Sequence, residues 1–369
     1  MHTKIILLSA NTSLFLFNFC LGIIQELLNS GYRVYCLAPR DYSSHKLEEL
    51  GVVYIEVSLE GKSINPLKEL KSLLAITELI TRLKPNYVFN FTIKMNMYVG
   101  LICRFLGIPY ANNISGLGTA FLYESIVFRL AQILYGYANR GAERVFFLNS
   151  DDKAFFIQKR LVNEQNAALI PGTGIDLQHF SYANFMETKP ITFLMISRLI
   201  ADKGVREYVA AAKIVKSKIP ESRFILVGPS SVSNKSAIQD EEITQWNNDG
   251  IIEYMGRQDD VREFIKKSHV LVLPSYREGM PRTVLEAASM GRPAIVTDVP
   301  GCRQSIANNK TGWLCKAKDV NDLAEKMLKV ANLSPEVLIK FGRSARQRVE
   351  TEFCEKIVIE QYLKCLSKL

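Results

Sequence analysis

Short apolar runs alternate with amphipathic stretches along almost the whole chain. In the first half, near-continuous apolar runs predict strands at residues 4–10, 32–40, 52–59, 86–92, 109–115 and 144–149. Between them, apolar positions recur at helical spacing and predict helices at residues 14–30, 43–51, 66–83, 97–106 and 121–141. Buried strands that alternate with helices are typical of a parallel sheet covered on both faces, so the pattern predicts an α/β fold.

The same alternation starts again after a polar stretch at residues 182–190. Strands are predicted at 191–198, 222–229, 251–256, 269–275, 293–298 and 312–315, with helices at 204–217, 261–268, from 283, and at 320–330. A chain of 369 residues is too long for one ordinary core. We therefore predict two doubly wound, Rossmann-like domains that face a cleft, at residues 1–183 and 184–350, and an amphipathic helix at 351–369 that packs back on the first domain.

Composition narrows the environment and the partner. No window has about 18 uninterrupted apolar residues, so no transmembrane span is expected. Seven scattered cysteines without a C-x-x-C pair indicate reduced thiols and a cytoplasmic location. The net charge of +9 suggests a phosphorylated ligand or an anionic membrane surface, with a generally basic surface as the alternative. Because no nucleic-acid-binding motif accompanies the charge, no nucleic-acid partner is expected.

The stretch "SYREGMPRTVLEA" carries the first candidate chemistry. Glu278 follows a strand at its carboxyl end, where open α/β sheets bind ligands. Pro281 suits the first turn of a helix, whose free N–H groups and dipole attract an anion such as a pyrophosphate. Glu278 and Glu286 could then hold opposite ends of a nucleotide-sugar, although two solvated carboxylates would look the same in the sequence.

Arg198 and Lys203 follow the first strand of the second half in "ISRLIADKG". An Arg fork and a Lys point charge would neutralise a diphosphate and stabilise it as a leaving group. Alone, this pair is equally consistent with two surface cations. The order of "LVGP", "YMGR", "PSYREGMPRTVLEA" and "GRPAIVTDVPG" after it is the order in which one Rossmann-like domain would build one nucleotide site.

With these motifs the chain resembles, over nearly its whole length, the retaining GT-B-fold glycosyltransferases of glycosyltransferase family 4. "REGMPRTVLEA", "NFTIKMNMYVG" and "NISGLGTAF" are similar to stretches of the members that extend lipid-diphosphate-linked sugars. The resemblance implies that Arg198 and Lys203 contact the donor diphosphate, that Glu278 contacts the donor sugar and that Glu286 contacts the ribose. It also implies a second set of donor-binding residues, namely Gly228, Tyr254, Gly256, Arg257, Gly279, Met280, Pro281, Arg282, Thr283 and Val284.

The first domain is expected to bind the acceptor. Its candidate residues lie after predicted strands: Asn11, Thr12, Ser13, Lys94, Gly116 and Gly118. For the first three, capping of the next helix is the alternative, for Lys94 a solvated surface position, and for the glycines an ordinary turn. The helix at 121–141 carries Arg129 and Arg140 among aromatic and aliphatic residues, so it suits either a membrane interface or a core.

The resemblance predicts a retaining hexosyltransferase. It would move a hexose or N-acetylhexosamine from a UDP-sugar to an undecaprenyl-diphosphate-linked sugar in capsule, O-antigen or related polysaccharide biosynthesis, as a peripheral protein of the cytoplasmic face of the inner membrane. Because the four histidines do not cluster, no metal site and no cofactor are expected. Two alternatives remain open at this point: a UDP-sugar epimerase of related fold, and a non-catalytic nucleotide-sugar-binding partner. The oligomeric state is not predicted.

Overall fold

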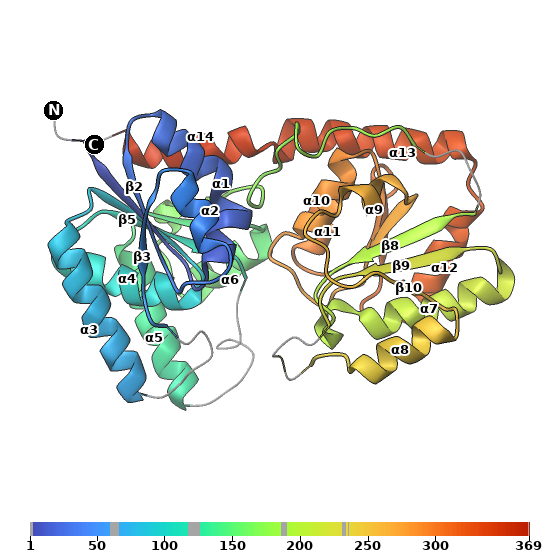
Figure 1. Cartoon of the computed structure of the whole chain (residues 1–369), viewed down its shortest axis with the longest axis horizontal. Helices are drawn as coiled ribbons and strands as arrows, with labels where there is room; N and C mark the ends of the chain where they lie inside the picture. Colours follow the sequence, from blue (N-terminus) through green and yellow to red (C-terminus); the bar gives the residue numbers. More distant parts are fainter. Residues whose placement is uncertain are drawn as a thin grey trace. The chain divides into compact units, whose positions relative to one another are not determined.

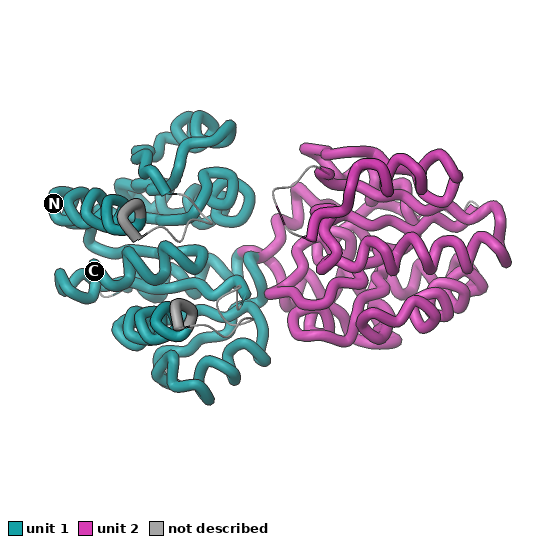
Figure 2. Tube along the Cα trace, turned by 90° about the horizontal axis from the view of Figure 1, so that it is seen from below, with its two compact units in different colours: residues 1–173, 356–369 teal, residues 174–355 magenta. Residues whose placement is uncertain are grey.

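The computed structural model describes residues 3–59, 66–116, 126–185, 190–230, 234, 236–367 and 369. The chain divides into two compact units (Figure 2). Unit 1 comprises residues 1–173 and 356–369, and unit 2 comprises residues 174–355. Each unit holds one parallel sheet with helices on both faces, as the alternating pattern predicts.

Unit 1 contains a seven-stranded parallel sheet with the order β3-β2-β1-β4-β5-β6-β7. Its strands are fully buried in the centre because helices cover both faces. Val88, Val145 and Phe147 point to one core, while Phe89 and Phe146 pack against Tyr362 on the other face. The strand bounds are β1 Ile5–Ser9, β2 Arg33–Ala38, β3 Val53–Glu56, β4 Tyr87–Phe91, β5 Tyr110–Ile114, β6 Arg144–Phe147 and β7 Ala167–Leu169.

The helices of unit 1 connect these parallel strands. Helices α3, α4 and α5 lie next to one another in one layer, and α1 lies beside α2 (Figure 1). Their bounds are α1 Ser13–Asn29, α2 Ser44–Glu49, α3 Pro66–Leu83, α4 Ile93–Leu106, α5 Ile126–Gly141 and α6 Ser150–Gln158, with the C-terminal α14 Glu355–Leu366.

Helix α14 joins unit 1 although most of the chain between it and residue 173 belongs to unit 2. Tyr362 is buried, stacks edge-on to Phe89, and donates a 2.6 Å hydrogen bond to Asn113 Oδ1. The expected amphipathic C-terminal helix therefore packs on the first domain through a specific polar contact as well as through its apolar face.

Unit 2 contains a six-stranded parallel sheet with the order β10-β9-β8-β11-β12-β13. Helices α7 and α12 pack together, as do α10 and α13 (Figure 1). The strands are β8 Thr192–Ile196, β9 Arg223–Val227, β10 Glu253–Tyr254, β11 Val270–Leu273, β12 Ala294–Thr297 and β13 Gly312–Cys315. The α-helices are α7 Val205–Lys218, α8 Asp240–Asn248, α9 Arg262–Lys266, α10 Arg282–Ser289, α11 Cys302–Ser305, α12 Val320–Ala331 and α13 Pro335–Arg348.

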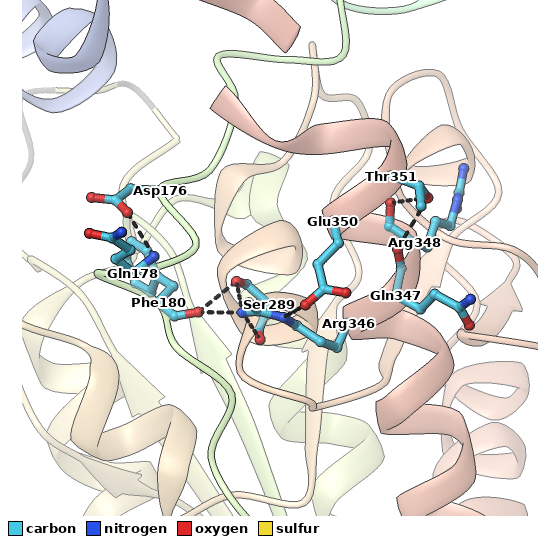
Figure 3. A network of polar contacts seen from close by, with 9 residues as sticks. All are labelled: Asp176, Gln178, Phe180, Ser289, Arg346, Gln347, Arg348, Glu350 and Thr351. Carbon is cyan, nitrogen blue, oxygen red and sulfur yellow. Dashed lines mark hydrogen bonds and ion pairs between the residues drawn. The ribbon is translucent and has the colours of Figure 1, made fainter. Parts of the chain in front are cut away.

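The first boundary between the units falls at residues 173 and 174, ten residues before the predicted one. Residues 174–183 belong to unit 2 because hydrogen bonds connect them to helices α10 and α13 of that unit, as Figure 3 shows. Arg346 of α13 donates to the carbonyls of Phe180 and Ser289 at 2.9 and 2.8 Å, and the Ser289 hydroxyl donates to the Phe180 carbonyl at 2.6 Å. Phe180 and Phe185 also join the apolar core of this unit.

Four helices are absent from the sequence prediction: α6, α8, α11 and α13. Helices α8 and α13 have largely polar sequences, "DEEITQWNN" and "PEVLIKFGRSARQR", in which few apolar positions mark a buried face. A π-helical segment, Val349–Phe353, follows α13 and ends before Cys354, which has extended backbone angles. Among the described helices, none is long and apolar enough to cross a bilayer.

A buried arginine fastens three segments of unit 2 to one another. The Arg292 side chain is fully buried, and its guanidinium directs all five N–H donors at backbone carbonyls. The acceptors, at 2.8 to 3.1 Å, belong to Ala183, Asn184, Lys266, Ser268 and Met290. Burial lowers the pKa of Arg292 to about 10, so the group remains protonated at neutral pH.

Candidate active site

Two of the predicted donor residues, Lys203 and Glu278, lie at the topological switch point of the sheet of unit 2. Strand β8 lies between β9 and β11, and the connections from these two neighbours lead to opposite edges of the sheet. In open α/β sheets, ligands bind outside the carboxyl ends of the strands at such a point. Lys203 follows β8 and Glu278 follows β11, so both loops leave the sheet there.

Lys203 and Glu278 form an ion pair at this point. Lys203 Nζ donates to Glu278 Oε1, and the Ser275 hydroxyl donates to the same oxygen at 2.7 Å. The two side chains are mostly buried, with 19% and 13% of their surfaces exposed. The two residues predicted to meet the donor diphosphate and the donor sugar are thus held together, with a small exposed fraction through which a ligand can reach them.

Two glycines allow the backbone to approach closely around this pair. Gly204 follows Lys203 with a φ of 74°, and a Cβ there would lie 2.2 Å from the Pro274 carbonyl oxygen. Gly301 has a φ of 83°, and a Cβ there would lie 2.3 Å from the carbonyl oxygen of Glu278. Larger side chains at either position would push the loop that carries Glu278 away.

Helix α10 begins immediately after this loop. Pro281 is its N-cap, and the helix runs from Arg282, one position earlier than predicted. The backbone N–H of Val284 donates to the Pro281 carbonyl at 3.1 Å. The N–H groups that can bind an anion at the helix start are therefore those of the residues before Val284. The Val284 side chain is also fully buried, which leaves it no direct contact with a ligand in this structure.

Glu286 lies one turn into α10 and is largely buried. Its Oε1 accepts a 2.8 Å hydrogen bond from Arg282 Nε. Arg282, at the start of the helix, therefore pairs with the carboxylate that is predicted to contact the ribose. Glu286 lies on the helix and Glu278 in the loop before it. Met280 packs against the apolar core, and Gly279 and Thr283 lie in the connecting turn and the first helical turn.

The ends of β8, β9 and β10 are tied together through Gly228. This residue has a φ of 149°, and a Cβ there would lie 1.7 Å from the Ser197 carbonyl oxygen, so no larger residue fits. Its N–H donates to the Gly256 carbonyl, and its carbonyl accepts from the Tyr254 hydroxyl, both at 2.9 Å. Three predicted donor residues thus form one bonded turn at the sheet edge.

Of the three arginines predicted near the donor, Arg198 and Arg257 are exposed. Arg198 lies two residues after the end of β8, and among the described residues it makes no ion pair. Arg257 is half exposed and lies 3.4 Å from Asp259. The exposed guanidinium of Arg198 lies in the loop after β8, where a diphosphate at the switch point can reach it. Arg257 follows the edge strand β10 and lies farther along the sheet.

A tyrosine and a glutamate that the sequence analysis did not single out support the ion pair. The Tyr276 hydroxyl donates to Glu207 Oε1 of α7 at 2.6 Å, and its N–H donates to the Asp202 carbonyl at 2.9 Å. The other carboxylate oxygen of Glu207 is buried and has no hydrogen-bond partner among the described residues. Burial and the neighbouring Glu207 raise the pKa of the Tyr276 phenol. These contacts join the Lys203 loop to the Glu278 loop a second time.

Replacing Tyr276 with phenylalanine is expected to lower kcat/KM about tenfold, because the loss of one charge-assisted hydrogen bond loosens the loop that orients Glu278. Steady-state kinetics with the predicted nucleotide-sugar donor varied would measure it. Tyr208→Phe is the control, since that hydroxyl is also hydrogen-bonded, to the backbone carbonyls of Phe193 and Ile225, but lies in the core. Equal loss of activity per folded enzyme in both variants would contradict a positioning role for Tyr276.

In unit 1 the predicted acceptor residues that follow β1 and β4 also lie at a switch point, between these two strands. The Thr92 hydroxyl donates to Asn11 Oδ1 at 2.7 Å and accepts from the Asn11 N–H at 3.2 Å, which ties the loops after the two strands. Thr92 has a φ of 70°, an unusual value for a β-branched residue. Asn11 thus lies at the edge where a ligand of this sheet would bind.

Two of the neighbouring candidates have structural partners instead. Thr12 is the N-cap of α1 and accepts from the Phe15 N–H at 3.1 Å, which is the capping alternative. Ser13 is fully buried, donates to Asp41 Oδ1 and accepts from the Ser44 hydroxyl, so burial removes it from the acceptor candidates. Gly116 has a φ of 153° with open space around it, and Gly118 lies outside the described residues.

Lys94 lies in the first turn of α4, near the end of β4. Its Nζ pairs with Glu69 Oε1 of α3 at 2.7 Å, and the Tyr98 hydroxyl donates to the other oxygen of Glu69. Both side chains of the ion pair are about five-sixths buried. A solvated surface lysine is therefore the wrong description of Lys94.

Within the described part of the chain, no three His, Cys, Asp or Glu side chains gather closely enough to hold a metal ion.

Comparisons with known proteins agree on one class of enzyme. The family "Glycosyl transferases group 1" matches residues 180–348, and the family "Glycosyl transferase 4-like" matches residues 4–149. The chain is 27% identical to the N,N'-diacetylbacillosaminyl-diphospho-undecaprenol alpha-1,3-N-acetylgalactosaminyltransferase of Campylobacter jejuni, over 96% of each protein. It is 26% identical to the UDP-Gal:alpha-D-GlcNAc-diphosphoundecaprenol alpha-1,3-galactosyltransferase of Escherichia coli, over 79% of this chain and 78% of that protein.

Solved structures agree on the fold. A glycosyltransferase from Rickettsia africae superposes with a TM-score of 0.78 at 18% identity, over the whole of both chains. HepE from Anabaena, solved in complex with UDP and glucose, superposes with a TM-score of 0.80 at 16% identity, over 99% of this chain and all of that one.

Proposed function

The chain belongs to the GT-B-fold glycosyltransferases, and from this premise we propose that it moves a hexose or N-acetylhexosamine from a UDP-sugar to an undecaprenyl-diphosphate-linked sugar. The observation that carries the proposal is the Lys203–Glu278 pair at the switch point, followed directly by the start of α10. The names of the two relatives from Campylobacter and Escherichia support the acceptor class, and the second name also supports a UDP-linked donor.

The donor diphosphate would lie over the start of α10. Its charge would be neutralised by Arg198 and Lys203 and by the dipole of the helix, as an anion is at a helix N-terminus. Glu278 would orient the sugar through its hydroxyl groups. Because these groups already neutralise the charge of the leaving diphosphate, we propose that catalysis needs no metal. We therefore expect transfer to continue in excess chelator.

The reaction would retain the configuration of the anomeric carbon. On the face from which the diphosphate leaves, the acceptor hydroxyl oxygen bonds to the anomeric carbon while the bond from that carbon to the diphosphate oxygen breaks. The hydroxyl proton passes to the departing diphosphate oxygen. The protein contributes electrostatic stabilisation of this leaving group and orientation of both substrates. The acceptor sugar would lie near Asn11 and Lys94, at the switch point of unit 1.

Purified protein incubated with a panel of UDP-sugars and an undecaprenyl-diphosphate-linked acceptor tests the proposal. UDP release that requires both substrates, with an α-linked product from an α-linked donor, is expected. Conversion of the UDP-sugar without acceptor would identify an epimerase instead. Binding of a UDP-sugar without UDP release in any membrane lipid extract would identify a non-catalytic partner. We further propose that the enzyme works as a peripheral protein at the cytoplasmic face of the membrane that holds the acceptor.

A further inference from the structure

One face of unit 1 exposes apolar side chains that a folded domain normally buries. On α5, four of them recur at positions i, i+3, i+4 and i+7, and two more end α4. Their exposed fractions range from 37% to 91%, and Phe105 is the most exposed. We call this surface the α4–α5 face, defined by Phe105, Leu106, Leu130, Ile133, Leu134 and Tyr137.

The two helices that carry these side chains pack against each other. Arg104 of α4 lies over the ring of Tyr137 of α5 at 3.6 Å and donates to the Tyr137 carbonyl. The inward side of α5 is packed, since Tyr135, Ala138 and Asn139 are fully buried. The described part of unit 1 therefore leaves the outer row of apolar side chains on α5 exposed, and α5 carries apolar side chains on both of its sides.

The exposed apolar residues are concentrated in this part of the molecule. Of the twelve large apolar side chains exposed in the described residues, six form the α4–α5 face and two more, Leu70 and Leu74, lie on the adjacent α3. Single exposed apolar residues are common on soluble proteins, whereas a contiguous group marks an interaction surface.

The charges around this face select its partner. Within their bounds, α4 and α5 contain no aspartate or glutamate. Of their four cations, Lys94 is mostly buried and paired with Glu69, which leaves Arg104, Arg129 and Arg140. A row of apolar side chains beside cations on surface helices suits the boundary between headgroups and acyl chains of an anionic bilayer. Two copies of the face would bring like charges together, which disfavours a symmetric dimer through it.

From this we infer that the α4–α5 face docks on an anionic phospholipid bilayer, with the α5 row in the headgroup boundary and Arg104 and Arg129 at lipid phosphates. Docking itself needs no transferase activity. Its bearing on the acceptor rests on the proposed function. Helix α4 begins next to Thr92 and Asn11, so the switch point of unit 1 lies at the end of a docked helix. A lipid-linked sugar diphosphate, which sits at headgroup level, could enter from there.

Vesicle sedimentation of the full chain tests the docking without any substrate. Binding is expected to vesicles of equal parts phosphatidylglycerol and phosphatidylcholine, and to be much weaker with phosphatidylcholine alone. Ile133→Asp and Phe105→Asp should each lower the vesicle partition coefficient at least about tenfold, and Arg129→Glu should lower it only for anionic vesicles. Val337→Asp, on the exposed face of α13 in unit 2, is the control and should bind as the wild type does.

These substitutions lie at exposed positions, so thermal unfolding should stay unchanged. Unaltered vesicle binding in Ile133→Asp and Phe105→Asp would overturn the inference, as would equal binding to neutral and anionic vesicles. A wild-type dimer in light scattering that Ile133→Asp dissociates, without any vesicle binding, would show that a second copy covers the face. If vesicle binding is confirmed while UDP release is absent, the docking stands and the proposed function fails.

Discussion

Replacing Lys203 with methionine is expected to lower kcat at least about a hundredfold while the protein stays folded. The substitution removes the positive charge that would stabilise the leaving diphosphate, and groups aimed at developing negative charge contribute about this much. The fold should survive because Glu278 keeps its 2.7 Å hydrogen bond from the Ser275 hydroxyl and part of its surface is exposed. Initial rates of UDP release at saturating acceptor, with circular dichroism of the same samples, would measure both effects.

Glu278→Gln should reduce turnover to a similar degree, because the amide still accepts from Ser275 but no longer pairs with Lys203. The double variant should lose little more than either single one, since residues that act as a unit are not additive. Arg206→Met is the matched control, because Arg206 forms an exposed ion pair with Glu242 on α7 and α8. Near-normal turnover in folded Lys203→Met or Glu278→Gln would show that this pair is structural and that the donor site lies elsewhere.

Replacing Arg292 with methionine is expected to destabilise the protein by at least about 3 kcal/mol, the upper range for a single substitution. Methionine fills much of the volume but leaves five buried backbone carbonyls without their donors. Arg292→Lys supplies at most three donors, so its free energy of unfolding should lie between those of the wild type and Arg292→Met. Urea unfolding of unit 2, followed by tryptophan fluorescence of Trp246 and Trp313, would report the change.

Arg223→Met is the surface control for Arg292. Arg223 forms an exposed pair with Glu253, and pairs of that kind contribute about 0 to 1 kcal/mol. If Arg292→Met fails to fold, Arg292→Lys still tests the argument. Stability equal to that of the wild type in Arg292→Lys would show that the carbonyls do not depend on the guanidinium fork.

The alternation of strands and helices was predictable because each element leaves its own local period in the sequence. The buried strands β1 and β4 read as nearly continuous apolar runs, and the helices that end just before glycines 31, 51 and 107 read as periodic segments with a stop signal. The polar helices α8 and α13 were not predicted, because their sequences contain few apolar positions that would mark the side facing unit 2. The division of the chain at residue 173 also escaped prediction, since it depends on Arg346 and Ser289, which lie more than one hundred positions from Phe180.

For the candidate site, the sequence by itself determined which residue types follow which strands: a lysine and an arginine after one, and a glutamate and a helix start after another. Only the tertiary structure decided that Lys203 meets Glu278, 75 positions away, and that Tyr276 meets Glu207. It also removed Ser13 from the acceptor candidates by burying it against Asp41. The physical reason is that β8 and β11 become neighbours only through the order of strands in the sheet, and strand order arises from the packing of the whole unit, which no local period encodes.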